Sequence, residues 1–162
     1  MPRILFLCTG NTCRSPLAEA LARSEFSGAG YRFDSAGLQT RSRAPVSAGS
    51  LLVASRHGLD LGNHRSKPVS LDLLQDAAWV IGMTRSHAAI FRSRFRGHHQ
   101  ARIGVLGAPG VDLTGQKASP PCEEVDDPYG QSDHIYTAVG DQILRLVQGW
   151  GPVFVAPADG TE

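Results

Sequence analysis

The segment over residues 4–16 constrains the fold of this chain more than any other part of its sequence. An apolar run, Ile-Leu-Phe-Leu, ends at Cys8, and a loop of small and polar residues separates it from Ser15 and Pro16, where a helical pattern begins. The run indicates a buried strand, and the Ser-Pro pair indicates a helix that Ser15 caps and Pro16 opens. Amide N–H groups of such a loop lack helical partners and converge with the positive end of the helix dipole. The segment therefore predicts a binding site for an anion.

Two side chains of this segment, Cys8 and Arg14, add chemistry to the anion site. A thiol ionises more readily beside a helix N-terminus and a guanidinium, which predicts that Cys8 is a nucleophile. The planar guanidinium of Arg14 fits two oxygens of a tetrahedral oxyanion, a fit that lysine lacks. A cysteine after a strand is most often a small core residue, and an arginine is most often exposed. The position of both residues in the anion loop favours the catalytic interpretation.

The rest of the chain alternates between strand and helix patterns, which indicates an α/β fold with a parallel sheet and helices on both faces. The long segment over residues 107–130 is rich in Gly, Pro and acidic residues and has the length of a functional loop. We expect one domain over residues 1–150 and a mobile C-terminal tail over residues 151–162. Strands are predicted over residues 3–8, 31–37, 77–83 and 101–106. Helices are predicted over residues 16–28, 45–58 and 71–75 (capped by Ser70), from Thr84 or Ser86 to Phe95, and after Ser132.

Composition indicates a globular protein with a single core. The chain has 162 residues, of which 41% are hydrophobic, and a formal net charge of +1. This low charge gives no general attraction to nucleic acid or to an anionic membrane. No apolar run is long enough to span a membrane, and the N-terminus leads into a strand instead of a signal peptide, so we expect a cytoplasmic protein. The oligomeric state is not indicated.

Cysteine and histidine spacing indicates neither a metal site nor a cofactor. The three cysteines include no paired motif, which favours reduced thiols over a disulfide scaffold. Cys122 is interpreted as an incidental loop thiol. The histidines expected on the surface are His57, His87, His98, His99 and His134.

The run Cys-Thr-Gly-Asn-Thr-Cys-Arg-Ser-Pro over residues 8–16 resembles the low-molecular-weight protein tyrosine phosphatase family, which also contains bacterial protein arginine phosphatases. The resemblance implies a flavodoxin-like, four-stranded parallel sheet with a ligand beyond the strand ends. It also implies a phosphatase in which Cys8 attacks phosphorus while Arg14 and the loop hold the phosphoryl group of a protein or peptide. The loop residues concerned are Thr9, Gly10, Asn11, Thr12, Cys13 and Ser15.

A thiolate phosphatase also needs a general acid that another part of the chain delivers to the leaving group. The sequence Asp126-Asp127-Pro128-Tyr129 in the long loop can supply this acid. The resemblance implies that Asp127, the residue before Pro, has this role and later activates water, and that Tyr129 borders the substrate. Residue chemistry alone leaves Asp126 as an alternative.

The resemblance implies further roles around the loop. A hydrogen-bonded network is expected to hold the loop in a strained shape, and the Ser15 hydroxyl is expected to stabilise Cys8 as a leaving group. A reversible bridge between Cys8 and Cys13 is expected to protect the nucleophile from oxidation. The expected network comprises Asn11, Ser15, Ser35 and His64.

Two features bear on the phosphoryl donor. Thr12 stands where tyrosine-directed members commonly have isoleucine and arginine phosphatases have threonine. The acid loop has one aromatic residue, Tyr129, where many tyrosine-directed members have two. We therefore favour phosphoarginine over phosphotyrosine as the substrate. Basic residues, including Arg41, Arg43 and those over 92–96, are interpreted as solvated surface or as attracting acidic polypeptide.

Two other functions remain as alternatives. Some arsenate reductases share this fold and loop, but they need further cysteines near the middle of the chain, and none lies between Cys13 and Cys122. Such a reductase also has no need for the acid Asp127. A non-catalytic anion-binding module would require neither the nucleophile nor the acid.

Overall fold

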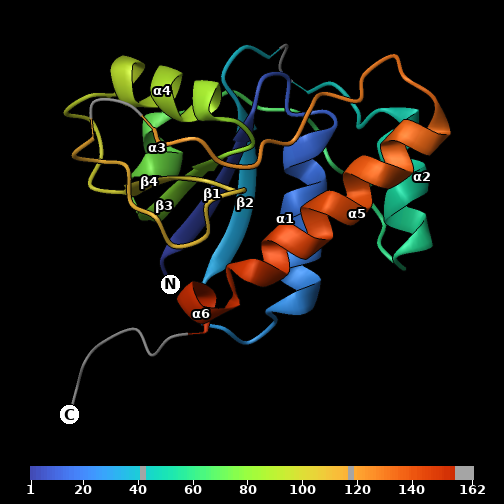
Figure 1. The fold of residues 1–162 in the computed structure, drawn as a ribbon, viewed down its shortest axis with the longest axis horizontal. Coiled ribbons are helices and arrows are strands. Elements are labelled where there is room, and N and C mark those ends of the chain that lie inside the picture. The colour runs from blue at the N-terminus through green and yellow to red at the C-terminus, as the bar shows by residue number, and fades with distance from the viewer. Residues whose placement is uncertain (41–42, 117–118, 156–162) are drawn as a thin grey trace.

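A computed structural model describes residues 1–40, 43–116 and 119–155 of the chain. A parallel sheet lies between two layers of helices (Figure 1), which confirms the predicted four-stranded α/β fold. The strands are β1 (Arg3–Cys8), β2 (Arg32–Gly37), β3 (Ala77–Gly82) and β4 (Arg102–Val105). The helices are α1 (Arg14–Glu25), α2 (Ala48–Arg56), α3 (Leu71–Leu74), α4 (Arg85–Arg94), α5 (Asp133–Gly149) and α6 (Gly151–Phe154).

The order of the strands creates a ligand-binding position at the end of β1. The order is β2-β1-β3-β4, and every neighbouring pair is parallel. Because β1 lies between β2 and β3, the chain moves from β1 to one side of the sheet and later returns to the other side. Such a reversal opens a crevice beyond the carboxyl ends of the two central strands, where open α/β sheets bind ligands. Cys8 is the last residue of β1 and therefore lies at this crevice.

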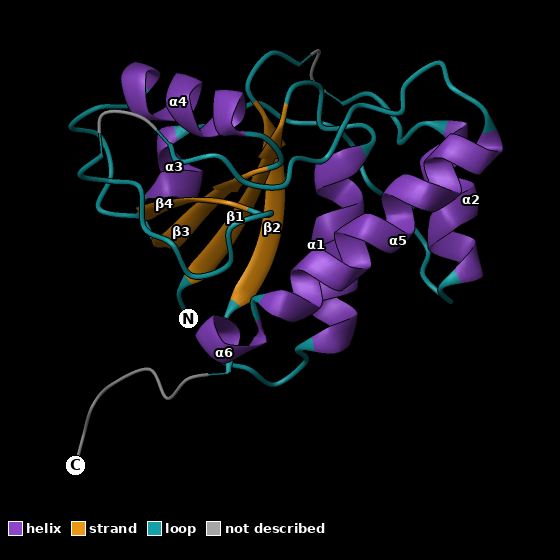
Figure 2. Ribbon diagram, in the orientation of Figure 1, coloured by secondary structure: helices purple, strands orange, loops and turns teal. Residues whose placement is uncertain are grey.

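Alternate residues of β1 point to opposite helix layers. Ile4, Phe6 and Cys8 belong to the core that the strand shares with α1, α2, α5 and α6. Leu5 and Leu7 belong to the core shared with α3 and α4. Figure 2 shows these two groups of helices on opposite sides of the sheet. Burial on both faces explains the continuous apolar run in the sequence, and it directs the Cys8 side chain toward α1.

The predicted start of the first helix is wrong. Helix α1 begins at Arg14 instead of Pro16, and no side chain caps its N-terminus. The Ser15 hydroxyl, which the sequence predicts as the cap, lies 3.0 Å from the Cys8 sulfur instead. Residues of the predicted anion loop therefore continue directly into the first helical turn.

The other helix starts agree better with the sequence. Ser70 and Ser132 cap α3 and α5 through their side chains, as predicted. Of the two predicted starts of α4, Thr84 is its cap and Ser86 lies within the helix. The prediction for α2 is wrong by three residues, because the helix begins at Ala48 and Pro45 instead pairs in an isolated antiparallel bridge.

Among the described residues, no helix has the length and hydrophobicity needed to cross a membrane.

The predicted domain end at residue 150 is too early. Helix α6 follows directly, and Phe154 is completely buried. Its ring packs edge-on against Phe6 and Phe33, with centroids 6.5 and 5.2 Å away, and it stacks on Trp150. An aromatic residue held this way belongs to the core, so residues 151–154 are part of the domain. Val155 follows and is exposed, and residues 156–162 of the predicted tail lie outside the described residues.

Candidate active site

The loop between β1 and α1 turns its carbonyl groups outward. Every carbonyl from residue 8 to residue 13 contacts a polar group of the surrounding protein. Because a trans peptide group points its N–H opposite to its C=O, the amides of residues 9–14 face the inside of the loop. The contacting groups, in order, are the Leu38 and Gln39 amides, the Thr40 hydroxyl, the His64 imidazole, the Ser47 amide and the Ser50 hydroxyl, at 2.7–3.2 Å.

Asn11 gives the loop its tight curvature. Its φ of 56° lies in the left-handed region, which Asn enters more readily than most other residues. The side chain is fully buried and donates to the hydroxyls of Ser15 and Ser35 at 2.9 and 3.0 Å. Its Oδ1 accepts a hydrogen bond from the Lys67 amide at 3.1 Å. These bonds, to α1, to β2 and to the loop that contains Lys67, hold the strained backbone in place. The structure thus brings together Asn11, Ser15 and Ser35 of the expected network.

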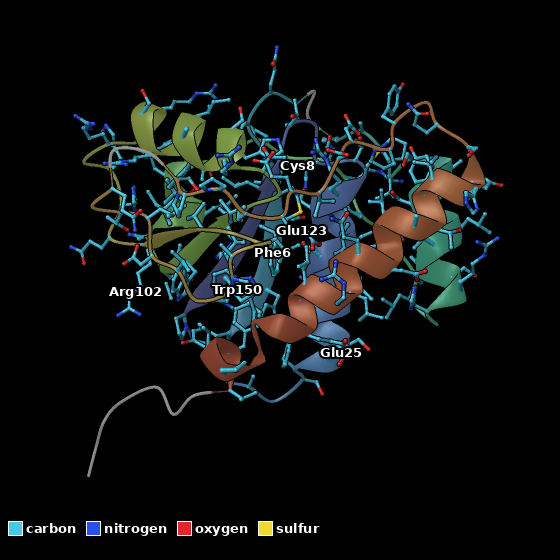
Figure 3. All side chains as sticks on the ribbon, in the orientation of Figure 1. Phe6, Cys8, Glu25, Arg102, Glu123 and Trp150 are labelled. Carbon is cyan, nitrogen blue, oxygen red and sulfur yellow. The ribbon has the colours of Figure 1, made fainter. Side chains whose placement is uncertain are left out.

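The sulfur of Cys8 has hydrogen-bond donors on two sides. The Asn11 amide donates to Cys8 Sγ at 3.2 Å, and Ser15 Oγ lies 3.0 Å from the same sulfur. Because Ser15 Oγ already accepts a hydrogen from the Asn11 side chain, its own hydrogen is available to the sulfur. Donors directed at a sulfur stabilise its negatively charged form. Figure 3 shows Cys8 at the end of the sheet where the loop lies.

A buried carboxyl group, that of Glu19, extends this network into the protein. The Ser35 hydroxyl donates to Glu19 Oε1 at 2.9 Å, and Arg23 pairs with Oε2 at 3.2 Å. Glu19 is buried, and this burial raises the pKa of its carboxyl group. Glu19 was not predicted as a site residue, because charged helix residues are usually exposed. Its position four residues after Ser15, on the same side of α1, is the signal that could have revealed it.

Arg14 is buried beside the loop with one edge of its guanidinium left for a ligand. Nη1 donates to the Val125 carbonyl at 3.0 Å. Nη2 lies 3.8 Å from Oδ2 of Asp127, and Nε is buried without a hydrogen-bond partner among the described residues. The Nε and Nη2 atoms form an edge with two parallel N–H groups, which matches two oxygens of a phosphoryl group.

Val125 anchors the segment that carries the predicted acid. Its side chain is fully buried, and its amide donates to the Met83 carbonyl at 3.1 Å. The segment passes so close to Gly107 that a Cβ there would lie 1.8 Å from the Glu123 carbonyl oxygen. Glycine is therefore required at residue 107 for the segment to reach its place beside the loop. Figure 3 labels Glu123 on this segment, between Cys8 and Phe6 in the view.

Asp127 follows this anchor and faces Arg14. Its Oδ2 lies 3.8 Å from Arg14 Nη2, while its Oδ1 accepts a hydrogen bond from the Tyr129 amide at 3.0 Å. The Asp127 side chain is 54% exposed, and Tyr129 is 71% exposed. The ion pair with Arg14 therefore distinguishes Asp127 from its neighbour Asp126. A carboxyl group at this border between loop and solvent can exchange a proton with a group that leaves the loop.

His87 is a site residue that the sequence analysis missed, and the prediction that it lies on the surface is wrong. It is only 5% exposed, in the first turn of α4. Its Nδ1 accepts a hydrogen bond from the Thr84 amide at 3.2 Å, so in the neutral ring Nε2 carries the hydrogen. Nε2 lies 3.0 Å from Thr9 Oγ1 and donates to it. The Thr9 hydroxyl thus keeps its own hydrogen for a ligand. The spacing of Thr84 and His87, typical of a capping box, could have revealed this histidine.

The neutral state of His87 predicts a pH-dependent stability. Burial, assisted by the charge of Arg14, lowers the pKa of His87 from 6.5 to about 4. The neutral His87 therefore makes its full contribution to the stability of the fold above pH 6.5. This contribution is lost as the pH falls from 6.5 through about 4. Between these pH values we expect the wild type to lose on the order of 2–3 kcal/mol more free energy of unfolding than His87→Asn, measured by urea denaturation.

The exposed His98 supplies the control for this experiment. His98→Asn should follow the wild-type dependence on pH. Equal losses in the wild type and in His87→Asn would contradict the assignment of a buried, neutral His87.

The His64 ring contacts the backbone of the loop. Its Nε2 is 3.1 Å from the Asn11 carbonyl, and because a carbonyl only accepts, this nitrogen carries a hydrogen. Burial lowers the pKa of His64, which favours the neutral ring. Of the other predicted surface histidines, His98 and His134 are exposed, whereas His57 and His99 are half-buried.

Cys13 points away from the inside of the loop. Its Sγ donates to the Ser47 hydroxyl at 3.2 Å and lies 3.6 Å from the Tyr136 hydroxyl. Burial raises the pKa of Tyr136 to about 12, so its hydroxyl stays protonated. Cys8, Cys13 and Cys122 are all free thiols. Within the described ranges, no cluster of three or more His, Cys, Asp or Glu residues could hold a metal ion.

Comparison with known proteins agrees with this geometry. Residues 3–153 match the family described as low molecular weight phosphotyrosine protein phosphatase. A protein-arginine-phosphatase of Bacillus subtilis (strain 168) is 33% identical over 147 residues, 90% of this chain and 91% of that protein. The low molecular weight protein-tyrosine-phosphatase Etp of Escherichia coli (strain K12) is 28% identical over 151 residues, 91% of this chain and 90% of that protein. A solved YwlE arginine phosphatase, in which a serine replaces the active-site cysteine and is phosphorylated, is similar with a TM-score of 0.82 and 27% identity, over 96% of this chain and 97% of that chain. The chain therefore belongs to the low molecular weight phosphotyrosine protein phosphatase family, whose members are hydrolases.

Proposed function

We propose that this protein hydrolyses phosphoarginine in proteins and that Cys8 forms a covalent thiophosphate intermediate. The arrangement around the Cys8 sulfur carries this proposal. Two donors hold the sulfur as an acceptor, the loop amides face inward, and the Nε–Nη2 edge of Arg14 is left for a ligand. A nucleophile surrounded by donors suits a tetrahedral phosphoryl group with negatively charged oxygens.

In the first step, the Cys8 sulfur attacks phosphorus in line with the leaving nitrogen. A sulfur–phosphorus bond forms as the phosphorus–nitrogen bond breaks. The loop amides and Arg14 stabilise the charge on the oxygens that stay with phosphorus. Asp127 donates a proton to the leaving nitrogen, so the arginine side chain departs as a guanidinium.

In the second step, water attacks the phosphorus of the thiophosphate. Asp127, now a carboxylate, accepts a proton from this water, and the sulfur–phosphorus bond breaks. The Ser15 hydroxyl, 3.0 Å from the sulfur, donates to the departing thiolate. The phosphorylated active-site serine of the YwlE relative supports transfer of the phosphoryl group to this residue of the loop.

Thr12 supports phosphoarginine as the donor. Its side chain is half-buried, and the one contact of its hydroxyl in the described chain is a long one of 3.9 Å to the Cys13 sulfur. A hydroxyl in this place can accept a hydrogen bond from a substrate guanidinium, whereas isoleucine would narrow the space and favour a flat phenyl ring. The arginine-directed relative from Bacillus subtilis supports the same choice.

Phosphotyrosine is the second candidate donor, because the Etp relative from Escherichia coli is named as a low molecular weight protein-tyrosine-phosphatase. Arsenate reduction has less support. No cysteine lies between Cys13 and Cys122 to resolve an arsenic adduct, and Cys122 is half-buried with a pKa that burial raises.

The proposal is tested with two peptides of one sequence, one carrying phosphoarginine and the other phosphotyrosine. We expect a higher kcat/KM for phosphoarginine, and we expect Thr12→Ile to shift the ratio of the two values toward phosphotyrosine by about tenfold or more. Thr12→Ser keeps the hydroxyl and is the matched control, so it should retain the wild-type ratio. A ratio that Thr12→Ile leaves unchanged would contradict the role of Thr12, and a wild-type preference for phosphotyrosine would overturn the proposed donor.

A further inference from the structure

A basic groove runs along α4, outside the site described above. It has a volume of about 580 Å³ and lies between α4 and the segment that contains Leu113. Its floor is apolar and includes Ile103 and Leu113. Arg85, Arg92 and Arg96 line it, and no acidic residue does among the residues that the structure describes. We call it the arginine groove. Figure 1 shows α4 above the sheet on the face opposite to α1 and α5.

Two of the three arginines have no counter-ion in the described part of the chain. Arg85 pairs with Glu124 at 3.1 Å. Arg92 and Arg96 take part in no ion pair or hydrogen bond among these residues, whereas Arg94, between them, donates to the Leu38 carbonyl. A groove lined by uncompensated positive charge over an apolar floor is complementary to a negatively charged, partly apolar chain.

One end of the arginine groove adjoins the candidate active site. Its first arginine, Arg85, starts the helix whose His87 contacts Thr9 at 3.0 Å. The Glu124 partner of Arg85 directly precedes Val125, whose carbonyl accepts from Arg14. The groove follows α4 away from the loop for roughly 14 Å, at a rise of 1.5 Å per helical residue. About four residues of extended peptide span this distance.

We propose that the arginine groove binds an acidic segment of the phosphorylated protein substrate. The inference rests on the proposed function only in taking a protein as the substrate, and it holds for either phosphorylated residue. Acidic side chains roughly three to seven positions from the phosphorylated residue reach Arg92 and Arg96, and apolar neighbours cover Ile103 and Leu113. The groove therefore selects among substrates by sequence, whereas the loop selects the phosphoryl group.

The test compares three substrates: an acid-flanked phosphopeptide, the same peptide with the acidic residues replaced by Gln or Asn, and para-nitrophenyl phosphate. We expect Arg92→Ala/Arg96→Ala to lower kcat/KM for the acidic peptide about five- to tenfold, through KM, with the difference disappearing at high salt. The other two substrates should change less than about twofold. The matched control, Arg32→Ala/Arg56→Ala, removes two exposed arginines elsewhere and should affect no substrate selectively.

Fluorescence anisotropy of the acidic peptide with the arginine variants in a Cys8→Ser background separates this inference from the proposed function, because binding needs no turnover. Weaker binding to Arg92→Ala/Arg96→Ala supports the arginine groove even if phosphotyrosine proves to be the better donor. Equal effects on the acidic and neutral peptides would overturn the inference. Displacement of the peptide by a single-stranded oligonucleotide at lower concentration than by unlabelled acidic peptide would overturn it as well.

Discussion

Cys8→Ser is expected to lower kcat by at least about 10⁴-fold on para-nitrophenyl phosphate and on both phosphopeptides. Serine keeps the size of the side chain and its contacts with Asn11 and Ser15, but its hydroxyl does not ionise in the range where a thiol does. The substitution therefore removes the nucleophile and leaves the loop and its donors in place. The turnover rate is measured by the release of inorganic phosphate. Thermal unfolding of the variant and the wild type shows whether the variant is folded.

The other loop cysteine provides the control for this substitution. Cys13→Ser keeps a donor beside Ser47 and should retain most of the activity, because the Cys13 sulfur points away from the inside of the loop. Full turnover by Cys8→Ser would contradict the mechanism. A wild-type protein that binds phosphate but turns over no phosphorylated substrate would instead support the non-catalytic anion-binding alternative.

Arg14→Lys is expected to lower kcat/KM by about 10²- to 10³-fold with the positive charge retained. Lysine cannot present two parallel N–H groups to the phosphoryl oxygens, and it cannot also donate to the Val125 carbonyl that Arg14 holds at 3.0 Å. Because Val125 anchors the acid segment, the substitution also disturbs Asp127. We therefore expect a lower kcat. We also expect inorganic phosphate to inhibit the variant more weakly than it inhibits the wild type.

Arg56→Lys is the matched control, since Arg56 is exposed at the last turn of α2 and its side chain contacts Thr137 of α5 instead of the loop. It should leave kcat/KM within about twofold of the wild type. A loss in Arg14→Lys no larger than in Arg56→Lys would show that the guanidinium edge does not bind the phosphoryl group.

The anion loop and the sheet could be predicted because both depend on local patterns. A strand that is buried on both faces reads as an unbroken apolar run, and Cys8 marks its end. The parallel sheet follows from the alternation of strands and helices. Asp127 could be found because the resemblance singles out the residue before Pro128, although only the structure brings it beside Arg14.

The remaining site residues depend on tertiary contacts that no local pattern reports. Glu19 and His87 are polar residues on helices, where exposure is the usual outcome, yet both are buried against the loop network. Ser15 fits the pattern of a helix cap, but the Cys8 sulfur and the Asn11 side chain compete for its hydroxyl. Phe154 comes shortly after Gly151 and Pro152, a pair that indicates the end of regular structure, and its burial depends on ring contacts in the aromatic core.

The most direct test of the central claim is to identify the residue that carries the phosphoryl group during turnover. Asp127→Ala, which slows hydrolysis of the intermediate, is mixed with phosphopeptide, denatured within milliseconds and digested for mass spectrometry. We predict that the peptide containing Cys8 gains the mass of one phosphoryl group, and that this species decays as phosphate is released. Turnover with the phosphoryl group on another residue, or with no phosphorylated enzyme at any time, would contradict the account.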